Sequence, residues 1–223
     1  ESRAKEVGLF AANLPENVGG GGLDYTSMAV IEREFGRTSH ALHAWVARPT
    51  ELLLATEGGQ KEHYLDACVT GAKRELFALS EPEAGSDIMS MKSHAKRDGD
   101  DWILNGSKHF ISGPLMPDFA IVFAITGHDE TPRGPRPRIT AFLVDVGMPG
   151  FDIQVGYNCV SYRGYLNFKL DFDNVRLSQN HILGEEGRGL ELSGKWLGMG
   201  RIWVGATCCG KAERLFEMAT SWA

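Results

Sequence analysis

Hydrophobic residues in the first third of the chain recur with the spacing of helices that keep one apolar side. Asp24 can cap one such helix and Gly36 can end it, because a carboxylate accepts hydrogen bonds from the free amides at a helix start and glycine tolerates the conformation at a helix end. Ser39 can cap a second helix, which a proline then interrupts. A third, short helix is expected over residues 60–69. The pattern predicts a helical N-terminal domain over residues 1–73.

From residue 74 onward the apolar positions alternate with a period near two, which is typical of strands. No helical segment separates the expected strands, and this favours an antiparallel barrel or sandwich over a parallel sheet with crossover helices. Turn signals stand at residues 98–100 and at Asn105-Gly106. This middle β domain is expected over residues 74–183. Its strand-like segments are residues 75–79, 101–105, 119–125, 139–144 and 165–170.

A long helical stretch begins near residue 189 and continues to Ala223. An interior glycine costs a helix about 1 kcal/mol relative to alanine, so the many glycines here predict that something packs close to the backbone. We assign residues 184–223 to the start of a C-terminal helical domain. The expected fold class is α+β and multidomain, with a helical N-terminal domain, an antiparallel barrel-like middle domain and the first helix of a truncated helical bundle. The glycines in question are Gly194, Gly198, Gly200, Gly205 and Gly210.

Composition and charge narrow the function classes. Hydrophobic residues make up 43% and charged residues 23% of the chain, which is typical of soluble globular proteins. A formal net charge of −6 argues against a nucleic-acid reader with a basic face. No apolar run is near the roughly 20 residues that span a bilayer, and no apolar signal segment opens the chain. The closest histidine pair, His40 and His43, has no third ligand, so no metal site is expected.

One segment changes character halfway. FALSEPEAGSD (77–87) begins as an apolar strand and becomes a small, polar corner at a proline, which has no amide hydrogen for a strand ladder. Ser80 presents a hydroxyl at this strand end, and a second strand-like segment ends similarly in Ser112. Together with Phe77 and Phe110, these residues can form a cradle for a planar heteroaromatic ring. The alternative is two ordinary strand ends with turn chemistry, and the residues alone leave both interpretations open.

FALSEPEAGSD resembles the signature of the acyl-CoA dehydrogenase family, and the resemblance covers essentially the whole chain. It implies an N-terminal helical domain, a middle β domain and a C-terminal four-helix bundle, with FAD as the cofactor and a thioester of coenzyme A as the substrate. The other segments that carry the resemblance, in family order, are NLPENVGG (13–20), NGSKHFIS (105–112), FDNVR (172–176), LGEEGRG (183–189), GRI (200–202) and AER (212–214).

The resemblance also implies roles for individual residues around FAD. The segment from Phe77 to Ser80 would line the isoalloxazine ring, and the Ser80 hydroxyl would hydrogen-bond its N1/O2 edge, which favours the anionic reduced flavin. Ser112 would lie close to flavin N5. The complete set of cofactor-binding residues implied by the resemblance is Phe77, Leu79, Ser80, Gly85, Ser86, Phe110, Ile111 and Ser112.

For the thioester the resemblance implies three contacts. Ser86 would touch both substrate and cofactor, Arg201 would lie near the bound thioester, and Arg136 would meet the nucleotide end of coenzyme A from a basic, proline-rich loop. A solvated loop is the alternative for Arg136. Two residues depart from the usual family pattern: Glu83 stands where glycine is common, and Phe110 replaces the commoner tryptophan that shields the flavin from its electron acceptor.

The implied activity is α,β-dehydrogenation, in which a carboxylate removes the α-proton while the β-carbon gives hydride to flavin N5. No catalytic base is assigned, because the resemblance places it beyond Ala223 and the alternative family position holds Gly200. The resemblance further implies an electron-transfer flavoprotein or similar acceptor, and a homotetramer or dimer of the full-length form. These residues alone would then have little activity.

Two other functions remain open. A flavin oxidase or monooxygenase of the same superfamily would let reduced flavin meet oxygen. A non-catalytic binding or assembly subunit would keep the fold without the base. The negative net charge gives little support to a function like that of a nucleic-acid-binding relative. The motifs do not indicate the length of the acyl chain. The four cysteines have the spacing of neither a zinc site nor a disulfide framework, which indicates reduced thiols. We therefore expect a bacterial cytoplasm or a mitochondrial or peroxisomal matrix rather than secretion.

Overall fold

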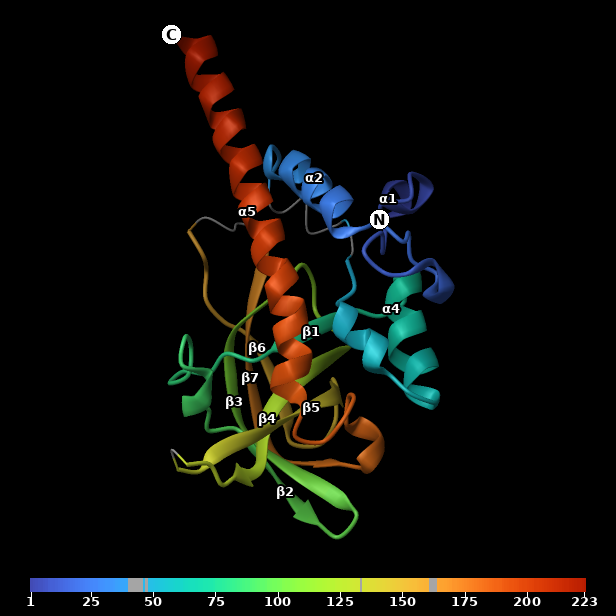
Figure 1. Ribbon diagram of the computed structural model, residues 1–223, viewed down its shortest axis with the longest axis vertical. Helices are drawn as coiled ribbons and strands as arrows, with labels where there is room; N and C mark the ends of the chain where they lie inside the picture. The colour runs from blue at the N-terminus through green and yellow to red at the C-terminus, as the bar shows by residue number, and fades with distance from the viewer. Residues whose placement is uncertain (40–45, 47, 133, 161–163) are drawn as a thin grey trace.

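The computed structural model describes residues 1–39, 46, 48–132, 134–160 and 164–223. Short helices come first, a curled sheet follows, and one long helix runs to the C-terminus (Figure 1). The helix expected after Ser39 and the pair His40 and His43 lie outside the described residues. No helix in the described part of the chain combines the length and the apolar character needed to cross a membrane.

The N-terminal region is helical, as the apolar spacing predicts. Asp24 is the N-cap of α2 (Tyr25–Gly36), and its side chain accepts a hydrogen bond from the backbone nitrogen of Ser27 at 2.7 Å. The short helix expected over residues 60–69 is present as a π-helical turn, η3 (Lys61–Asp66), continued by α4 (Ala67–Thr70). The other short helical elements are α1 (Ser2–Glu6), η1 (Glu16–Val18), η2 (Glu51–Ala55), η4 (Ile88–Ser90) and η5 (Gln179–His181).

Within the described ranges, seven strands form one mixed sheet in the order β1-β4-β2-β3-β7-β6, with β5 paired to β4. β1 and β2 both pair with β4 in parallel, and the remaining pairings are antiparallel. The strands are β1 (Glu75–Ala78), β2 (His94–Asp98), β3 (Asp101–Gly113), β4 (Phe119–Asp129), β5 (Arg136–Asp145), β6 (Phe151–Val155) and β7 (Leu166–Leu177).

The expected fold class is confirmed, with two parallel pairings that the series of strands did not indicate. Each of the five predicted strand segments overlaps a strand, namely β1, β3, β4, β5 and β7. The apolar pattern does not predict β2 and β6, because most of their side chains are solvent-exposed and give no clear apolar alternation. The domain boundaries after residues 73 and 183 stay predictions.

The turn predicted at Asn105-Gly106 is wrong. Gly106 lies inside β3, at a shift in the register of β3 against β7. Its φ is 143°, and a Cβ at this position would stand 2.2 Å from the hydroxyl oxygen of Ser93. An isolated glycine within a strand marks a bulge or a close approach of another segment. Gly106 shows both features, the register shift and the contact with Ser93. The other predicted turn is confirmed, because Asp98 and Asp101 pair across the β2–β3 hairpin.

Both faces of the sheet are buried, and the side chains of β4 contribute to both cores. Ala120 and Val122 point into the core inside the curl, together with Trp102 and Phe168. The alternate side chains of β4 point into a second core between the sheet, the N-terminal helices and the first turns of the C-terminal helix. A strand buried on both faces reads as a continuous apolar run instead of an alternating one, as residues 119–125 do.

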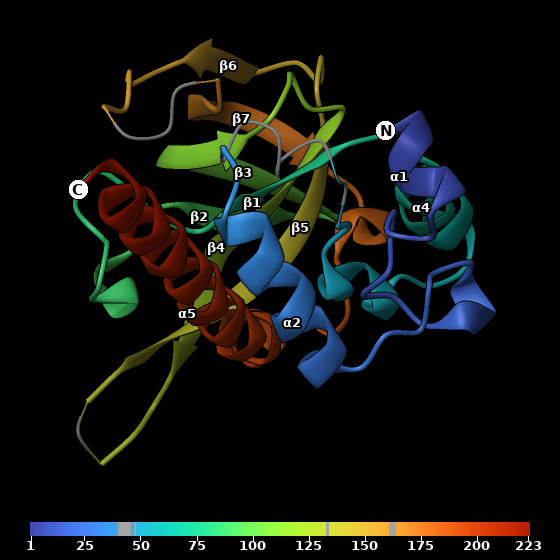
Figure 2. The ribbon, with the colours of Figure 1, turned by 90° about the horizontal axis from the view of Figure 1, so that it is seen from above.

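The long helix α5 (Gly189–Trp222) crosses α2 at close range (Figures 1 and 2). A Cβ on Gly210 would stand 1.7 Å from the carbonyl oxygen of Arg33, and a Cβ on Gly36 would stand 2.0 Å from that of Thr207. The predicted close packing on α5 is therefore confirmed at Gly210. It is wrong for the other four glycines singled out above, around which no atom of the described residues lies within 4 Å of an added Cβ.

Candidate functional site

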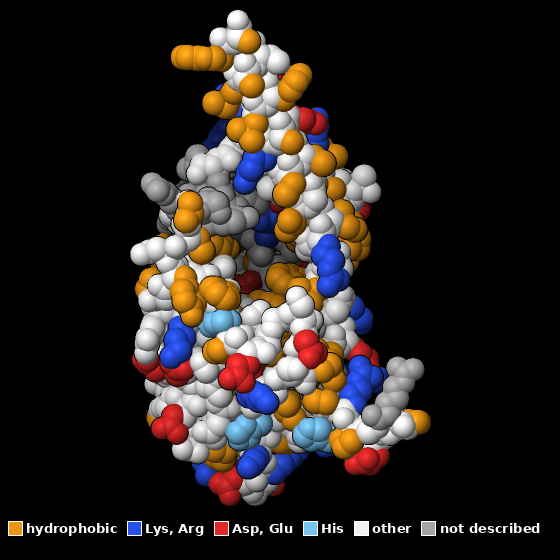
Figure 3. All heavy atoms as spheres, turned by 90° about the vertical axis from the view of Figure 1, so that its left-hand side faces the viewer, with side chains coloured by type: hydrophobic (Ala, Val, Ile, Leu, Met, Phe, Trp, Pro, Cys, Tyr) orange, Lys and Arg blue, Asp and Glu red, His pale blue; other side chains and the backbone are white. Residues whose placement is uncertain are grey.

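Two segments that are far apart in the sequence meet where β1 ends beside β3. The backbone amide of His109 donates to the carbonyl oxygen of Ser80 at 3.0 Å, which places Ser80 next to the segment Phe110–Ser112. A cavity of about 770 Å³ opens beside them, in the size range of ligand pockets. Figure 3 shows one face of the molecule hollowed beside α5, with hydrophobic side chains on the rim.

The cavity gathers most of the residues expected at the site. Gly85 and Ser86 are instead exposed on the loop that follows β1, and Arg136 is exposed at the start of β5. These three are not among the described residues that line the cavity. The structure thus brings the remaining expected residues together around one cavity and leaves these three outside it. The expected site residues that line the cavity are Phe77, Leu79, Ser80, Phe110, Ile111, Ser112 and Arg201.

Phe110 holds a strained backbone conformation at the mouth of this cavity. Its φ is 55°, in the left-handed region that residues other than glycine rarely adopt. The register of β3 against β7 shifts between Lys108 and Ile111, so Phe110 lies in a bulge. The residue is 54% exposed, and its ring centroid lies 4.6 Å from that of Tyr157. Bulges and strained residues concentrate at functional sites, where they redirect a side chain.

The cavity wall combines aromatic faces with hydroxyl groups. The ring of Phe77 packs on Trp196 of α5, with centroids 4.4 Å apart and an interplanar angle of 36°. In the part of the chain that the structure describes, the Ser80 hydroxyl has no hydrogen-bond partner, whereas the Ser112 hydroxyl accepts from the side-chain nitrogen of Asn167 at 3.3 Å. A slot with apolar faces and an uncommitted hydroxyl fits a planar ring with a polar edge.

A buried ion pair lies behind this wall. The Nζ of Lys108 donates to Oε1 of Glu81 at 2.7 Å and to the carbonyl oxygen of Leu79 at 3.1 Å, and the two charged side chains are 0% and 3% exposed. The Glu81 carboxylate also accepts from the backbone nitrogens of Lys92 at 2.6 Å and Ser93 at 3.1 Å. These contacts attach the corner after β1 to β3 and to the start of β2.

The environment shifts the pKa of both members of the pair. Burial lowers the pKa of Lys108 to about 8, although the charge of Glu81 and its hydrogen bond act to raise it. Burial acts to raise the pKa of Glu81, but the Lys108 charge and the hydrogen bonds outweigh it, and the pKa of Glu81 is lowered. Both groups are therefore charged at neutral pH. The sequence pattern did not predict this pair. The available signal was one charged residue in each of the two motif segments, Glu81 in residues 77–87 and Lys108 in residues 105–112.

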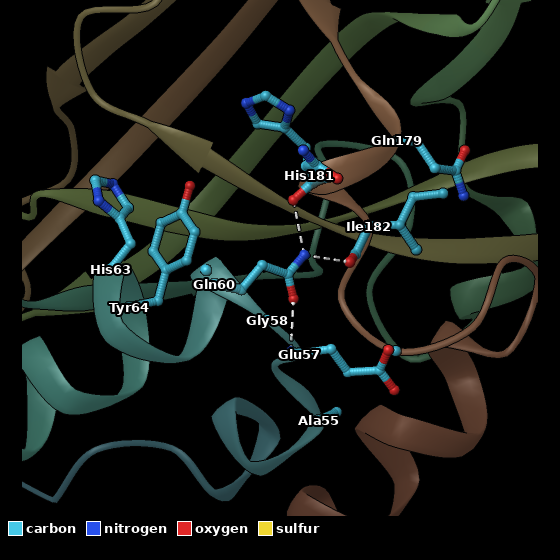
Figure 4. A pocket seen from close by; sticks show the side chains of 12 residues that line it. Ala55, Glu57, Gly58, Gln60, His63, Tyr64, Gln179, His181 and Ile182 are labelled. Carbon is cyan, nitrogen blue, oxygen red and sulfur yellow. Dashed lines mark hydrogen bonds between the residues drawn. The ribbon is translucent and has the colours of Figure 1, made fainter.

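A second cavity, of about 620 Å³, lies between the N-terminal helices and the segment after β7 (Figure 4). Gln60 reaches across it, and its Nε2 donates to the carbonyl oxygens of Asn180 and Ile182, each at 2.7 Å. Its Oε1 accepts from the backbone nitrogen of Glu57 at 3.2 Å. Both N–H donors of the Gln60 amide thus join the two regions, and we interpret this cavity as a structural joint.

The variant Gln60→Ala is expected to lower the free energy of unfolding by about 1–2 kcal/mol, because two carbonyl oxygens lose their donor. Gln179→Ala is the matched control, since Gln179 lines the same cavity but is exposed, and it should change stability by less than about 0.5 kcal/mol. Urea unfolding measures both. Equal stability of the two variants would contradict the interpretation of Gln60 as a joint.

Comparisons with known proteins agree with this architecture. Residues 2–72 match the family "Acyl-CoA dehydrogenase, N-terminal domain", and residues 76–175 match "Acyl-CoA dehydrogenase, middle domain". The chain is 32% identical over 222 residues to the human short-chain specific acyl-CoA dehydrogenase, mitochondrial, covering 97% of this chain and 53% of that protein. It is 31% identical over 223 residues to the caffeyl-CoA reductase-Etf complex subunit CarC of Acetobacterium woodii, covering 98% of this chain and 58% of that protein.

A solved structure extends the agreement to three dimensions. The acyl-CoA dehydrogenase from Bacillus anthracis, complexed with FAD, superposes with a TM-score of 0.84 at 29% identity, over 99% of this chain and 38% of that chain. The chain spans about half the length of the curated relatives that it matches. The matches run through the helical region and the sheet in the order in which both are observed here. The chain belongs to the acyl-CoA dehydrogenase family.

Proposed function

We propose that this chain takes part in the FAD-dependent α,β-dehydrogenation of an acyl-CoA thioester. The observation that carries the proposal is the cavity wall on which the uncommitted hydroxyl of Ser80 stands beside Phe110 and Ser112. The proposal is supported by a relative named as an acyl-CoA dehydrogenase and by a structural neighbour named as complexed with FAD. Together these favour flavin chemistry over the turn-chemistry alternative.

The residues present fit such a cofactor. When bound, FAD would supply the hydride acceptor for the oxidation. The hydroxyls of Ser80 and Ser112 would hold the polar edge of the ring, and donation from Ser80 would stabilise negative charge that develops there. The packed pair Phe77 and Trp196 would keep water from the ring. We assign no base to this chain, because Gly200 lines the cavity without a side chain.

Residues outside the cavity keep a role in the proposal. FAD and coenzyme A are both larger than the ring cradle, so the exposed residues Gly85, Ser86 and Arg136 remain available to the parts that extend beyond it. Arg201 lies on α5 at the cavity and is exposed, which suits a contact with the polar thioester end of the substrate. We propose these contacts on position and charge alone.

The proposal includes partners. An electron-transfer flavoprotein or similar acceptor would reoxidise the cofactor, and the support is a relative that is named as a subunit of an Etf complex. We also propose a homo-oligomer, because the upper part of α5 exposes a group of large apolar side chains (Figure 3). These are Leu215, Phe216, Met218 and Trp222, with exposed fractions of 61%, 70%, 54% and 94%.

The test is the visible absorption spectrum of the full-length protein, recorded before and after anaerobic addition of a panel of acyl-CoAs. Yellow protein that bleaches with a thioester is the expected result. Colourless protein that FAD cannot reconstitute would leave the non-catalytic subunit as the better explanation. Rapid oxygen consumption after substrate addition would instead support the oxidase or monooxygenase alternative.

Ser80 offers a sharper test of the cofactor site. Ser80→Ala is expected to weaken FAD binding about tenfold, because one hydrogen bond of roughly 1.4 kcal/mol is lost. Ser80→Thr keeps the hydroxyl and should bind FAD within about threefold of the wild type. Flavin fluorescence quenching measures both affinities. The assignment of Ser80 is wrong if both variants bind FAD as the wild type does.

A further inference from the structure

The residues that line the large cavity differ in polarity between the segment near Ser80 and the start of β1. Along β1, Leu76 and Ala78 point into the sheet core, so the alternate residues Glu75 and Phe77 face the cavity, and both line it. Five residue steps of about 3.3 Å separate Ser80 from Glu75, or about 16 Å. The cavity therefore has an aromatic end near the proposed ring site and a carboxyl group well away from it.

The carboxyl group of Glu75 is held in a defined orientation. Its Oε1 accepts from the backbone nitrogen of Thr50 at 2.7 Å, and its Oε2 accepts from the thiol of Cys68 at 3.3 Å. Burial raises the pKa of Glu75. A carboxylate offers about four lone-pair positions, and these two contacts use only part of that capacity. The remainder is available to a donor in the cavity.

Nearby charged groups are directed to other partners. The Nζ of Lys73 lies 2.7 Å from Nε2 of His63, and Arg74 pairs with Glu1. No cation lies within ion-pairing distance of Glu75 in the described ranges. The immediate partners of Glu75 are thus neutral: the backbone amides of Thr50 and of Glu75 itself, and the thiol of Cys68.

The buried pair at this end of the cavity does not change that conclusion. Arg48 pairs with Glu32, and the Glu32 carboxylate also accepts from the hydroxyl of Thr207 at 3.2 Å. The two charges compensate each other. The Glu75 carboxyl lines the same cavity and keeps acceptor capacity for a ligand.

We propose that Glu75 is a specificity-determining residue that selects acyl thioesters carrying a hydrogen-bond donor, a hydroxyl or an amine, toward the far end of the acyl group. The proposal rests on the function proposed above. A saturated chain that reached Glu75 would displace water and leave the carboxyl facing hydrocarbon, which is unfavourable. A donor at that point would complete its hydrogen bonding, and sites built to hydrogen-bond a substrate group reject the analogue that lacks it.

The test measures Kd by calorimetry for full-length, FAD-loaded protein with three thioester series of increasing length: saturated acyl-CoAs, ω-hydroxyacyl-CoAs and ω-aminoacyl-CoAs. At one chain length, the hydroxyl or the amine compound is expected to bind about 10- to 100-fold more tightly than its saturated counterpart. Comparison of the two substituted series identifies which donor is preferred. Absence of any such preference at every length would overturn the proposal.

Two variants assign the preference to this side chain. Glu75→Ala should abolish it, because the acceptor is lost and the cavity end becomes apolar. Glu75→Gln is the second variant, in case Glu75→Ala does not fold. The glutamine side-chain oxygen is expected to keep the hydrogen bond from the Thr50 amide, so the side-chain nitrogen takes the place of the second acceptor oxygen. The preference for a donor-bearing thioester should then fall at least tenfold. Glu62→Ala, which alters an exposed glutamate outside the cavity, should leave the preference unchanged.

The two proposals fail in different ways. A preference that survives in Glu75→Ala and Glu75→Gln overturns the role of Glu75, while bleaching of the flavin by the same thioesters would still support dehydrogenation. If no thioester bleaches the flavin, the proposed function fails. The calorimetric Kd values then still show whether Glu75 selects a donor, because they do not depend on turnover.

Discussion

Replacement of either member of the Glu81–Lys108 pair is expected to lower the free energy of unfolding by about 3–5 kcal/mol. Each single change, Glu81→Leu or Lys108→Met, leaves the partner charge buried without compensation, and this is the costly way to break a buried ion pair. The side chains are 3% and 0% exposed, so solvent cannot rescue the remaining charge. Urea or thermal unfolding measures the loss.

The double variant Glu81→Leu/Lys108→Met is the matched control. It removes both charges and fills a similar volume, so its stability should lie well above that of either single variant and near the wild type. The backbone amides of Lys92 and Ser93 lose an acceptor in this variant, which is expected to retain a deficit of about 1–2 kcal/mol. A double variant as unstable as the sum of the singles would show that the charges do not act as a pair.

The same pair predicts a pH dependence. The pKa of Glu81 is lowered in the folded state, so its stabilising contribution is fully present above the unfolded value of 4.5 and is lost as the pH falls through the folded value. The wild type should therefore lose stability below pH 4.5 more steeply than the double variant, which has no charge at this position. Identical acid profiles would mean that other carboxyl groups dominate acid unfolding.

Substitution of Gly210 by alanine is expected to destabilise the contact between α5 and α2 by about 3 kcal/mol. The added Cβ would stand 1.7 Å from the carbonyl oxygen of Arg33, which is backbone and cannot rotate away. The helices would have to separate, and this kind of overpacking is costly. Trp203, which is 8% exposed and packs with Met28 of α2, should report the separation as a red shift of its fluorescence.

Gly205→Ala is the control on the same helix. In the described part of the chain no atom lies within 4 Å of a Cβ added there, so the variant should gain about 1 kcal/mol from helix propensity. Opposite signs for two Gly→Ala changes only five residues apart would locate the close contact. If both variants are stabilised, the two helices are not in backbone contact at Gly210.

The energies of the contacts between α2 and α5 show which of them sets the distance between the two helices. Arg33 pairs with Glu213 and Arg37 with Glu217, each at 2.7 Å, but these side chains are partly exposed, from 27% to 46%. Exposed ion pairs contribute about 0–1 kcal/mol each. The glycine contacts therefore define the distance between the two helices, because a single added methyl group would force the backbones apart. The ion pairs make a smaller contribution to the stability of the crossing.

The sequence by itself determined the class of fold and the two motif segments whose residues line the large cavity. Helical and alternating periodicities are local properties of the chain, and so are a capping carboxylate such as Asp24 and a proline that ends a strand. They predicted the helical, β and helical regions and singled out Ser80, Phe110 and Ser112, which line one cavity. The family resemblance rests on motifs that are likewise continuous in the sequence.

Only the tertiary structure decided how distant residues use these features. The partner of Lys108 lies 27 residues away, the bulge at Phe110 depends on the register of β3 against β7, and only Gly210 of the glycines singled out on α5 meets another backbone. Glu75 lies beside the motif in sequence, yet its place at the far end of the cavity became visible only with the contacts of Thr50 and Cys68. Register, burial and charge pairing are set by which segments meet in space, and no local pattern encodes them.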